Sequence, residues 1–188
     1  MRLTCILIIF LSIIALPAFA QQITSTKMEV ISGKEGNYHF EIPAGMFRPQ
    51  GNFRPLTDTR NIKVWTSTEH QAVISLFTTS VHFGEGKEIR TMQDLTDFCR
   101  EGIQVTYKAG GADWSVASGY DKEGKIVYRK GFFSELTSMQ GRDQGEPSWV
   151  WSKAMILEFR YPAASAPVMN KIVAAAVKSF GCSPFLLD

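Results

Sequence analysis

Residues 149–161, WVWSKAMILEFRY, are the stretch that decides the fold. Large apolar side chains occupy alternate positions, with Lys153 the exception in the series: Trp149, Trp151, Met155, Leu157, Phe159 and Tyr161. Successive side chains of a strand point to opposite faces of its sheet, so this alternation predicts a β-strand with one strongly apolar face. The opposite face is mixed, and Pro162 ends the strand.

The next segment, SAPVMNKIVAAAVKSFG at residues 165–181, has a different period. Its apolar residues recur at steps of three and four, which predicts an amphipathic helix. Ser165 is the expected N-cap, and Gly181 is the expected end of the helix. We expect the apolar side of this helix to cover the sheet.

The N-terminal half of the chain is expected to supply further strands. Alternation, or a high content of β-branched and aromatic residues, predicts strands at 28–31, 38–42, 62–66 and 71–83. The third and fourth are joined by a turn near residues 68–70. Residues 43–59 contain three prolines and two glycines, and they are expected to form a long surface loop.

A second helix is predicted from Thr91, because its hydroxyl and Asp94 have the spacing of a capping box. We expect this helix to run until Gly110-Gly111. Strands at 114–120 and 125–137 then flank a turn at 121–124, and residues 138–147 form a second polar loop. Short connections favour a mainly antiparallel sheet, so the predicted class is α+β, with about six strands packed against two or more α-helices.

This order of elements resembles the Mog1/PsbP-like family. The resemblance rests on five features: a strand ending at Ile42-Pro43, a mid-chain helix, a meander containing GYDKEGKIVY at 119–128, a last strand into Arg160-Tyr161-Pro162, and a helix closing with Lys178-Ser179-Phe180. It implies an α/β sandwich, and it implies a binding or accessory role more than catalysis. The chain matches no site motif of the family, so no functional residue is carried over.

The first 20 residues are typical of a cleavable export signal. Arg2 precedes an apolar run at 5–16, and Pro17-Ala18-Phe19-Ala20 provides an Ala-x-Ala cleavage site. A permanent membrane anchor is the alternative, but a bilayer-spanning helix takes about 20 apolar residues. We expect residues 21–188 to form one globular domain that is periplasmic or secreted, with no stable membrane insertion after cleavage.

Charge and cysteine content narrow the expected partners and covalent structure. The chain carries 20 Lys and Arg against 18 Asp and Glu, and this balance argues against nucleic acid and against a polybasic membrane patch. Cleavage removes Cys5 and leaves Cys99 and Cys182, which form a candidate disulfide in an oxidising compartment. The alternative is two separately buried thiols.

No motif for catalysis, for a metal or for a cofactor stands out. His39, His70 and His82 are isolated from one another, and the chain has no Gly-x-Ser-x-Gly sequence and no Cys-x-x-Cys pair. We therefore predict no catalytic residue, no metal ligand and no cofactor. Cys99 lies on the apolar stripe of the predicted middle helix, a position that favours burial over nucleophilic chemistry.

The strand aromatics are expected to be core residues first, with a ligand groove as the alternative: Trp114, Tyr120, Tyr128, Phe132, Phe133, Trp149, Trp151 and Phe159. Arg48, Arg54, Arg142 and Asp143 lie in the two predicted loops and are candidates for a ligand or partner surface. Scattered solvated arginines are the alternative there.

The sequence thus favours an exported, non-catalytic binding or accessory protein of the bacterial envelope. Its expected partner is a protein of the same compartment. Two alternatives stay open. One is a secreted hydrolase with a dispersed Ser/Cys-His site, and the other is a carrier of a small apolar ligand.

Overall fold

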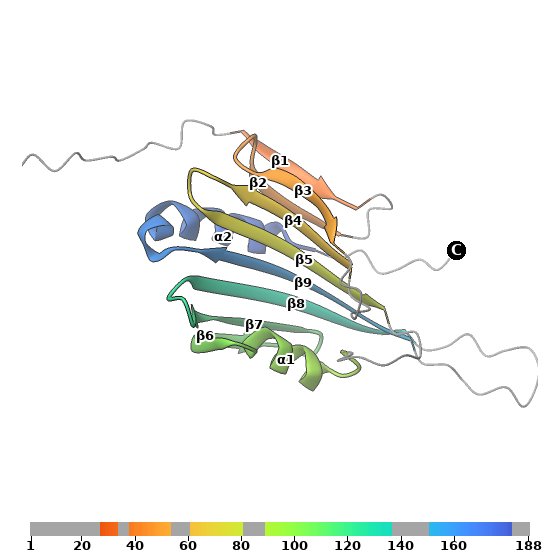
Figure 1. The fold of residues 1–188 in the computed structure, drawn as a ribbon. Coiled ribbons are helices and arrows are strands. Elements are labelled where there is room, and N and C mark those ends of the chain that lie inside the picture. Colours follow the sequence, from red (N-terminus) through yellow and green to blue (C-terminus); the bar gives the residue numbers. More distant parts are fainter. Residues whose placement is uncertain (1–26, 34–37, 54–60, 81–88, 137–150, 182–188) are drawn as a thin grey trace, which may run out of the picture.

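The computed structural model describes residues 27–33, 38–53, 61–80, 89–136 and 151–181. Within these ranges the chain forms a seven-stranded sheet, a separate two-stranded sheet and two α-helices (Figure 1). All strand pairs are antiparallel. The predicted α+β class is confirmed, with more strands than the sequence indicated.

The seven-stranded sheet is built around the stretch that ends at Tyr161. Its strands, in spatial order, are β3 (Arg48–Phe53), β4 (Asn61–Ser67), β5 (Ala72–Ser80), β9 (Trp151–Tyr161), β8 (Ile126–Leu136), β7 (Trp114–Asp121) and β6 (Ile103–Gly110). Strand β9 is central, paired with β5 on one side and β8 on the other. The two-stranded sheet pairs β1 (Met28–Ser32) with β2 (His39–Pro43).

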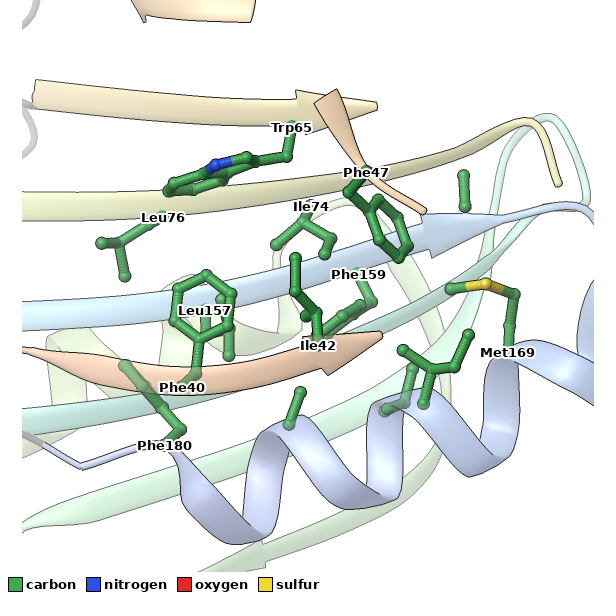
Figure 2. Close-up of a cluster of buried hydrophobic side chains, with 14 of the residues drawn as sticks. Phe40, Ile42, Phe47, Trp65, Ile74, Leu76, Leu157, Phe159, Met169 and Phe180 are labelled. Carbon is green, nitrogen blue, oxygen red and sulfur yellow. The ribbon is translucent and has the colours of Figure 1, made fainter. Parts of the chain in front are cut away.

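Helix α2 (Ala166–Ser179) and strand β2 cover one face of the large sheet. The apolar positions of β9 point to this side, as the alternation predicted: Met155, Leu157, Phe159 and Tyr161 are all buried. Figure 2 shows Phe40 of β2 between Trp65 of β4 and Phe180 at the end of α2, with Ile42 farther along β2 near Ile74 and Phe159. This is the main hydrophobic core.

Helix α1 (Met92–Arg100) covers the opposite face over β6, β7 and β8 (Figure 1). Leu95 and Cys99 pack there against Ala117, Ala154 and Ile156 in a second core. The mixed face of β9 is therefore buried as well. The predicted capping box is confirmed, since the Thr91 side chain accepts from the Asp94 amide and the Asp94 side chain accepts from the Thr91 amide.

The predicted loop over 43–59 is wrong in part, because it contains strand β3. Proline and glycine weaken the strand signal there, but β3 is an edge strand that needs hydrogen bonds on one side only. Its register with β4 shifts between Pro49 and Asn52, and Gly51 has a φ of +96°. A bulge of this kind absorbs residues that would disrupt a central strand.

The middle helix is shorter than predicted, because it ends at Arg100 and residues 103–110 form β6. Gly102 adopts a φ of +70°, a conformation that glycine accepts easily, and it turns the chain out of the helix. Ile103 stands at the three- to four-residue spacing of the apolar residues in the helix, although it belongs to the strand. The residues after it include Val105, Thr106 and Tyr107, which favour a strand.

The C-terminal helix begins and ends close to the predicted residues, but its start is stabilised differently. Ser165 precedes α2 without a side-chain cap bond, and its hydroxyl donates to the His70 carbonyl at 2.9 Å. The turn at 121–124 is confirmed, with Gly124 at a φ of +75°. The proposed export signal and the loop at 138–147 lie outside the described residues.

The predicted disulfide is corrected at Cys99, which is a free, fully buried thiol. Cys99 belongs to the core under α1. Gly181, the residue before Cys182, pairs with His39 of β2 on the other face of the sheet. Cys182 itself lies outside the described residues. The alternative of a buried thiol therefore holds for Cys99.

Candidate functional site

A pocket of about 370 Å³ opens beside α2, where the helix leaves the β6 end of the sheet uncovered. We call it the tyrosine pocket and define it by its ten lining residues: Thr106, Ser118, Gly119, Tyr120, Ile126, Tyr128, Tyr161, Asn170, Val173 and Ala174. They come from β6, β7, β8, β9 and α2. The volume lies near the lower end of the roughly 300–1,000 Å³ typical of small-molecule sites.

Strand register places the sheet residues of the pocket on one face. Ser118 pairs with Tyr128 between β7 and β8, and Tyr120 pairs with Ile126 two residues along the same strands. Residues that pair directly across an antiparallel ladder share a face. The Thr106 hydroxyl donates to the Ser118 carbonyl at 3.3 Å, at the point where the register of β6 shifts.

Helix α2 forms the opposite wall and is tied to the sheet at the pocket. The Tyr161 hydroxyl donates to Asn170 Oδ1 at 2.8 Å, which fixes the amide and leaves its Nδ2 group as a donor. Farther along the helix, Lys130 donates to the Val177 carbonyl at 2.9 Å. These two bonds hold α2 at a defined distance from β8 and β9, and the pocket keeps its shape as a result.

Two of the pocket tyrosines, Tyr161 and Tyr128, have raised pKa values and are held in their protonated form. Burial, followed by the nearness of Tyr120 and Tyr128, raises the pKa of Tyr161 to about 12. Burial, followed by the nearness of Tyr107, raises the pKa of Tyr128 above its ordinary value. A phenol with a raised pKa donates and accepts hydrogen bonds at neutral pH but scarcely ionises, so almost no phenolate is present to act as a base. The site is therefore suited to holding a ligand.

The residues singled out in the sequence as a partner surface are not brought together in the described part of the chain. Arg48 lies exposed on the edge strand β3. Arg54, Arg142 and Asp143 lie outside the described residues. Strand β3 and the tyrosine pocket are at opposite ends of the sheet (Figure 1), so Arg48 takes no part in the pocket.

Two of the three histidines can be placed. His39 packs against Gly181 at the end of β2, and the backbone of His70 accepts from Ser165 in the turn before β5. His82 lies outside the described residues. No group of three or more His, Cys, Asp or Glu side chains within metal-binding reach occurs in the described ranges.

Cys99 lacks the setting of a nucleophile. Burial raises the pKa of its thiol to about 11, and Cys99 Sγ donates to the Ser115 carbonyl at 3.8 Å. A reactive cysteine needs a lowered pKa and access to solvent. The thiol behaves as a core residue.

A buried ion pair lies under α1, on the other side of the sheet from the pocket. Arg129 Nε donates to Glu158 Oε2 at 2.6 Å, and both side chains are less than 10% exposed. The same arginine donates to the Phe98 and Glu101 carbonyls at 2.9 and 2.7 Å. It thus binds the carbonyl groups that end helix α1, and its role is structural.

The sequence pattern alone does not predict the pocket, although two of its tyrosines belong to the strand aromatics for which a groove was the alternative. Tyr120 and Tyr128 were expected in the core, with a groove as the alternative, and the structure bears out the groove for these two: Tyr120 is 44% exposed and Tyr128 is half-buried. Phe159 is a core residue as expected. The available signal was the alternation of side chains in the two strands that flank the 121–124 turn, because it places both tyrosines on the same face of the sheet. Nothing in the sequence places Asn170 next to them.

No family model matches the chain, and no curated protein matches its sequence. Among solved structures, the chain is similar to the solution structure of cyanobacterial PsbP (CyanoP) from Synechocystis sp. PCC 6803. The two share 10% sequence identity at a TM-score of 0.44, over 83% of this chain and 92% of that chain. Neither helix in the described part of the chain has the length and hydropathy of a membrane span.

Proposed function

We propose that this chain is an exported, non-catalytic binding protein of the bacterial envelope, and that the tyrosine pocket is its binding site. The observation that carries the proposal is the make-up of the pocket wall. Its ten residues include no carboxylate, imidazole, amine or thiol. Acid–base and nucleophilic catalysis draw mainly on those groups, whereas binding needs only shape, apolar surface and hydrogen bonds.

Export is supported by the sequence of the first 20 residues, which has the charged, apolar and small-residue regions of a signal in order. Expression in a bacterium followed by N-terminal sequencing of the released protein tests this step. A mature chain beginning at Gln21 is expected. Recovery of the uncleaved chain in the membrane fraction would contradict export by cleavage.

The hydrolase alternative is less well supported. Cys99 is buried with a raised pKa, and the described histidines His39 and His70 do not line the pocket. The carrier of a purely apolar ligand is also less favoured. Six of the ten lining residues carry a hydroxyl or amide group, and an apolar ligand would desolvate the Asn170 Nδ2 group and the Ser118, Tyr120 and Tyr128 hydroxyls without offering them a hydrogen bond.

Screening a chemically mixed fragment library by amide chemical shifts tests the binding function. Fragments that bind are expected to change the chemical shifts of backbone amides in β7, β8 and α2 around the pocket. The Tyr120→Ala substitution should weaken the binding of these fragments. Val30→Ala is the matched control, because Val30 is 62% exposed on β1, at the far end of the molecule. Fragments that collect elsewhere, or that bind the Tyr120→Ala protein equally well, would contradict the assignment.

A further inference from the structure

The tyrosine pocket carries no charge on any of its lining residues. Two lysines of the neighbouring turn and strand bind other groups: Lys125 pairs with Glu123 at 2.9 Å, and Lys130 binds the Val177 carbonyl and lies over the Phe132 ring. Arg160 belongs to the opposite face and pairs with Asp121 and Glu158. A phosphate or carboxylate ligand would find no cation in the wall, so an anionic ligand is disfavoured.

The wall combines two kinds of surface at close range. Ile126, Val173 and Ala174 are apolar, and the tyrosine rings add flat aromatic surface. Between them lie hydroxyl groups of Thr106 and Ser118 and the amide of Asn170. A complementary ligand must therefore be neutral, with apolar C–H surface and several donors and acceptors on the same small frame.

Tyr120 is the accessible aromatic of this set. It is 44% exposed, while Tyr161 is 2% exposed and bonded to Asn170. An exposed tyrosine loses little conformational entropy on contact and offers a rigid ring for stacking. The buried tyrosines instead form the fixed base against which a ligand would rest.

We propose that the tyrosine pocket binds an uncharged sugar ring, with Tyr120 stacked on its C–H face and with Ser118, Tyr128 and Asn170 bonding its hydroxyl groups. This proposal rests on the proposed binding function and specifies its ligand class. A pyranose ring has an apolar C–H face and a rim of hydroxyl groups, the two features that the wall complements. A quaternary ammonium ion is the competing aromatic-site ligand, but it has no donors or acceptors to pair with the polar residues of the wall.

The test uses amide chemical shifts with three sets of probes. The first is a panel of neutral sugars: methyl glucoside, methyl galactoside, N-acetylglucosamine and their β-1,4-linked disaccharides. The second is choline, and the third is cyclohexanol. At least one sugar is expected to give saturable shifts in the pocket, with choline and cyclohexanol at least about tenfold weaker, since a lost set of hydrogen bonds costs about that much.

Two variants separate stacking from hydrogen bonding. Tyr120→Ala should weaken sugar binding about tenfold or more, and Tyr128→Phe, which keeps the ring, should weaken it about threefold to tenfold. Val30→Ala should bind as the unmodified protein does. Because Tyr120 is 44% exposed, its truncation should leave the thermal midpoint nearly unchanged, so loss of binding would not reflect unfolding.

The outcomes distinguish this proposal from the broader one. If choline or cyclohexanol changes the chemical shifts of the pocket amides and no sugar does, the sugar proposal is overturned and the pocket remains a binding site. Sugar shifts outside the pocket, or shifts unaffected by Tyr120→Ala, would also overturn it. If none of the probes binds at the tyrosine pocket and no fragment of the library binds there either, both proposals fail.

Discussion

Replacing Arg129 by methionine should be among the single substitutions on the α1-facing side of β8 that lower the free energy of unfolding the most. The arginine bonds Glu158 at 2.6 Å and donates to the Phe98 and Glu101 carbonyls at 2.9 and 2.7 Å. Methionine fills similar space but donates nothing. Arg129→Met would therefore leave a buried carboxylate without its main partner and the end of α1 without a charged cap.

The magnitude follows from the burial of the pair. Breaking a buried pair by removing one partner costs about 3–5 kcal/mol, because the remaining charge is desolvated and uncompensated. Arg160 also contacts Glu158, but at 3.4 Å and with its own side chain 37% exposed, so it compensates only in part. We expect a loss of about 3 kcal/mol in the free energy of unfolding, at the lower end of that range.

Urea unfolding followed by tryptophan fluorescence measures the loss as a lower midpoint with an unchanged m-value. Arg160→Met is the matched control, since it removes longer contacts to Glu158 and to Asp121 that are made by a side chain 37% exposed. It should cost no more than about 1 kcal/mol. Amide exchange in the last turn of α1 should rise in Arg129→Met and stay unchanged in the control.

The double variant Arg129→Met/Glu158→Leu tests the mechanism directly. Removing both charges takes away the unpaired carboxylate, so the double variant should be more stable than the sum of the single effects predicts, by about 2 kcal/mol. Single effects that add within about 0.5 kcal/mol, or equal losses for Arg129→Met and Arg160→Met, would refute the reasoning.

Two further predictions concern the sheet and its cores. Burial raises the pKa of the Cys99 thiol from an ordinary 9.0 to about 11, so the folded protein binds this proton more tightly than the unfolded chain does. The resulting contribution of about 3 kcal/mol to stability is complete below pH 9 and is lost as pH rises towards 11. Cys99→Ala should flatten the fall in urea midpoint over that interval, and an unchanged fall would contradict the assignment. A Cβ on Gly119 would overlap the Gln104 carbonyl oxygen. Gly119→Ala should therefore lower the free energy of unfolding by about 1–3 kcal/mol, and amide exchange should be faster in the paired residues of β6 and β7. A variant as stable as the parent would show that β6 moves freely.

Much of the local structure could be predicted from the sequence. The alternation in residues 151–161, the helical spacing of 166–179, the Thr91–Asp94 box and the glycine of the 121–124 turn are all local signals, and each produced the expected element. Such signals are strong because they depend on neighbouring backbone geometry alone. Strand β3 escaped prediction because its proline and glycine are tolerated only at an edge, and edge position is not a local property.

The candidate site was beyond the reach of local pattern. Tyr120, Tyr128, Tyr161 and Asn170 are spread over 51 positions of the chain, and they meet because β7, β8 and β9 are neighbours and α2 folds back over them. The Arg129–Glu158 pair has the same origin, since it joins β8 to β9 under α1. Register decides which side chains share a face, and only the assembled sheet sets register.

The amino-acid sequence by itself determined the α+β class, the central strand β9 with its apolar face, and the two amphipathic helices, because hydrogen bonding within an element and the spacing of its apolar residues are encoded locally. Only the tertiary structure decided that the second face of β9 is buried too, that Cys99 and the end of α2 lie on opposite sides of the sheet, and that a neutral pocket opens beside α2. These features depend on which distant segments pack together, and that choice is made by the burial of apolar surface over the whole chain.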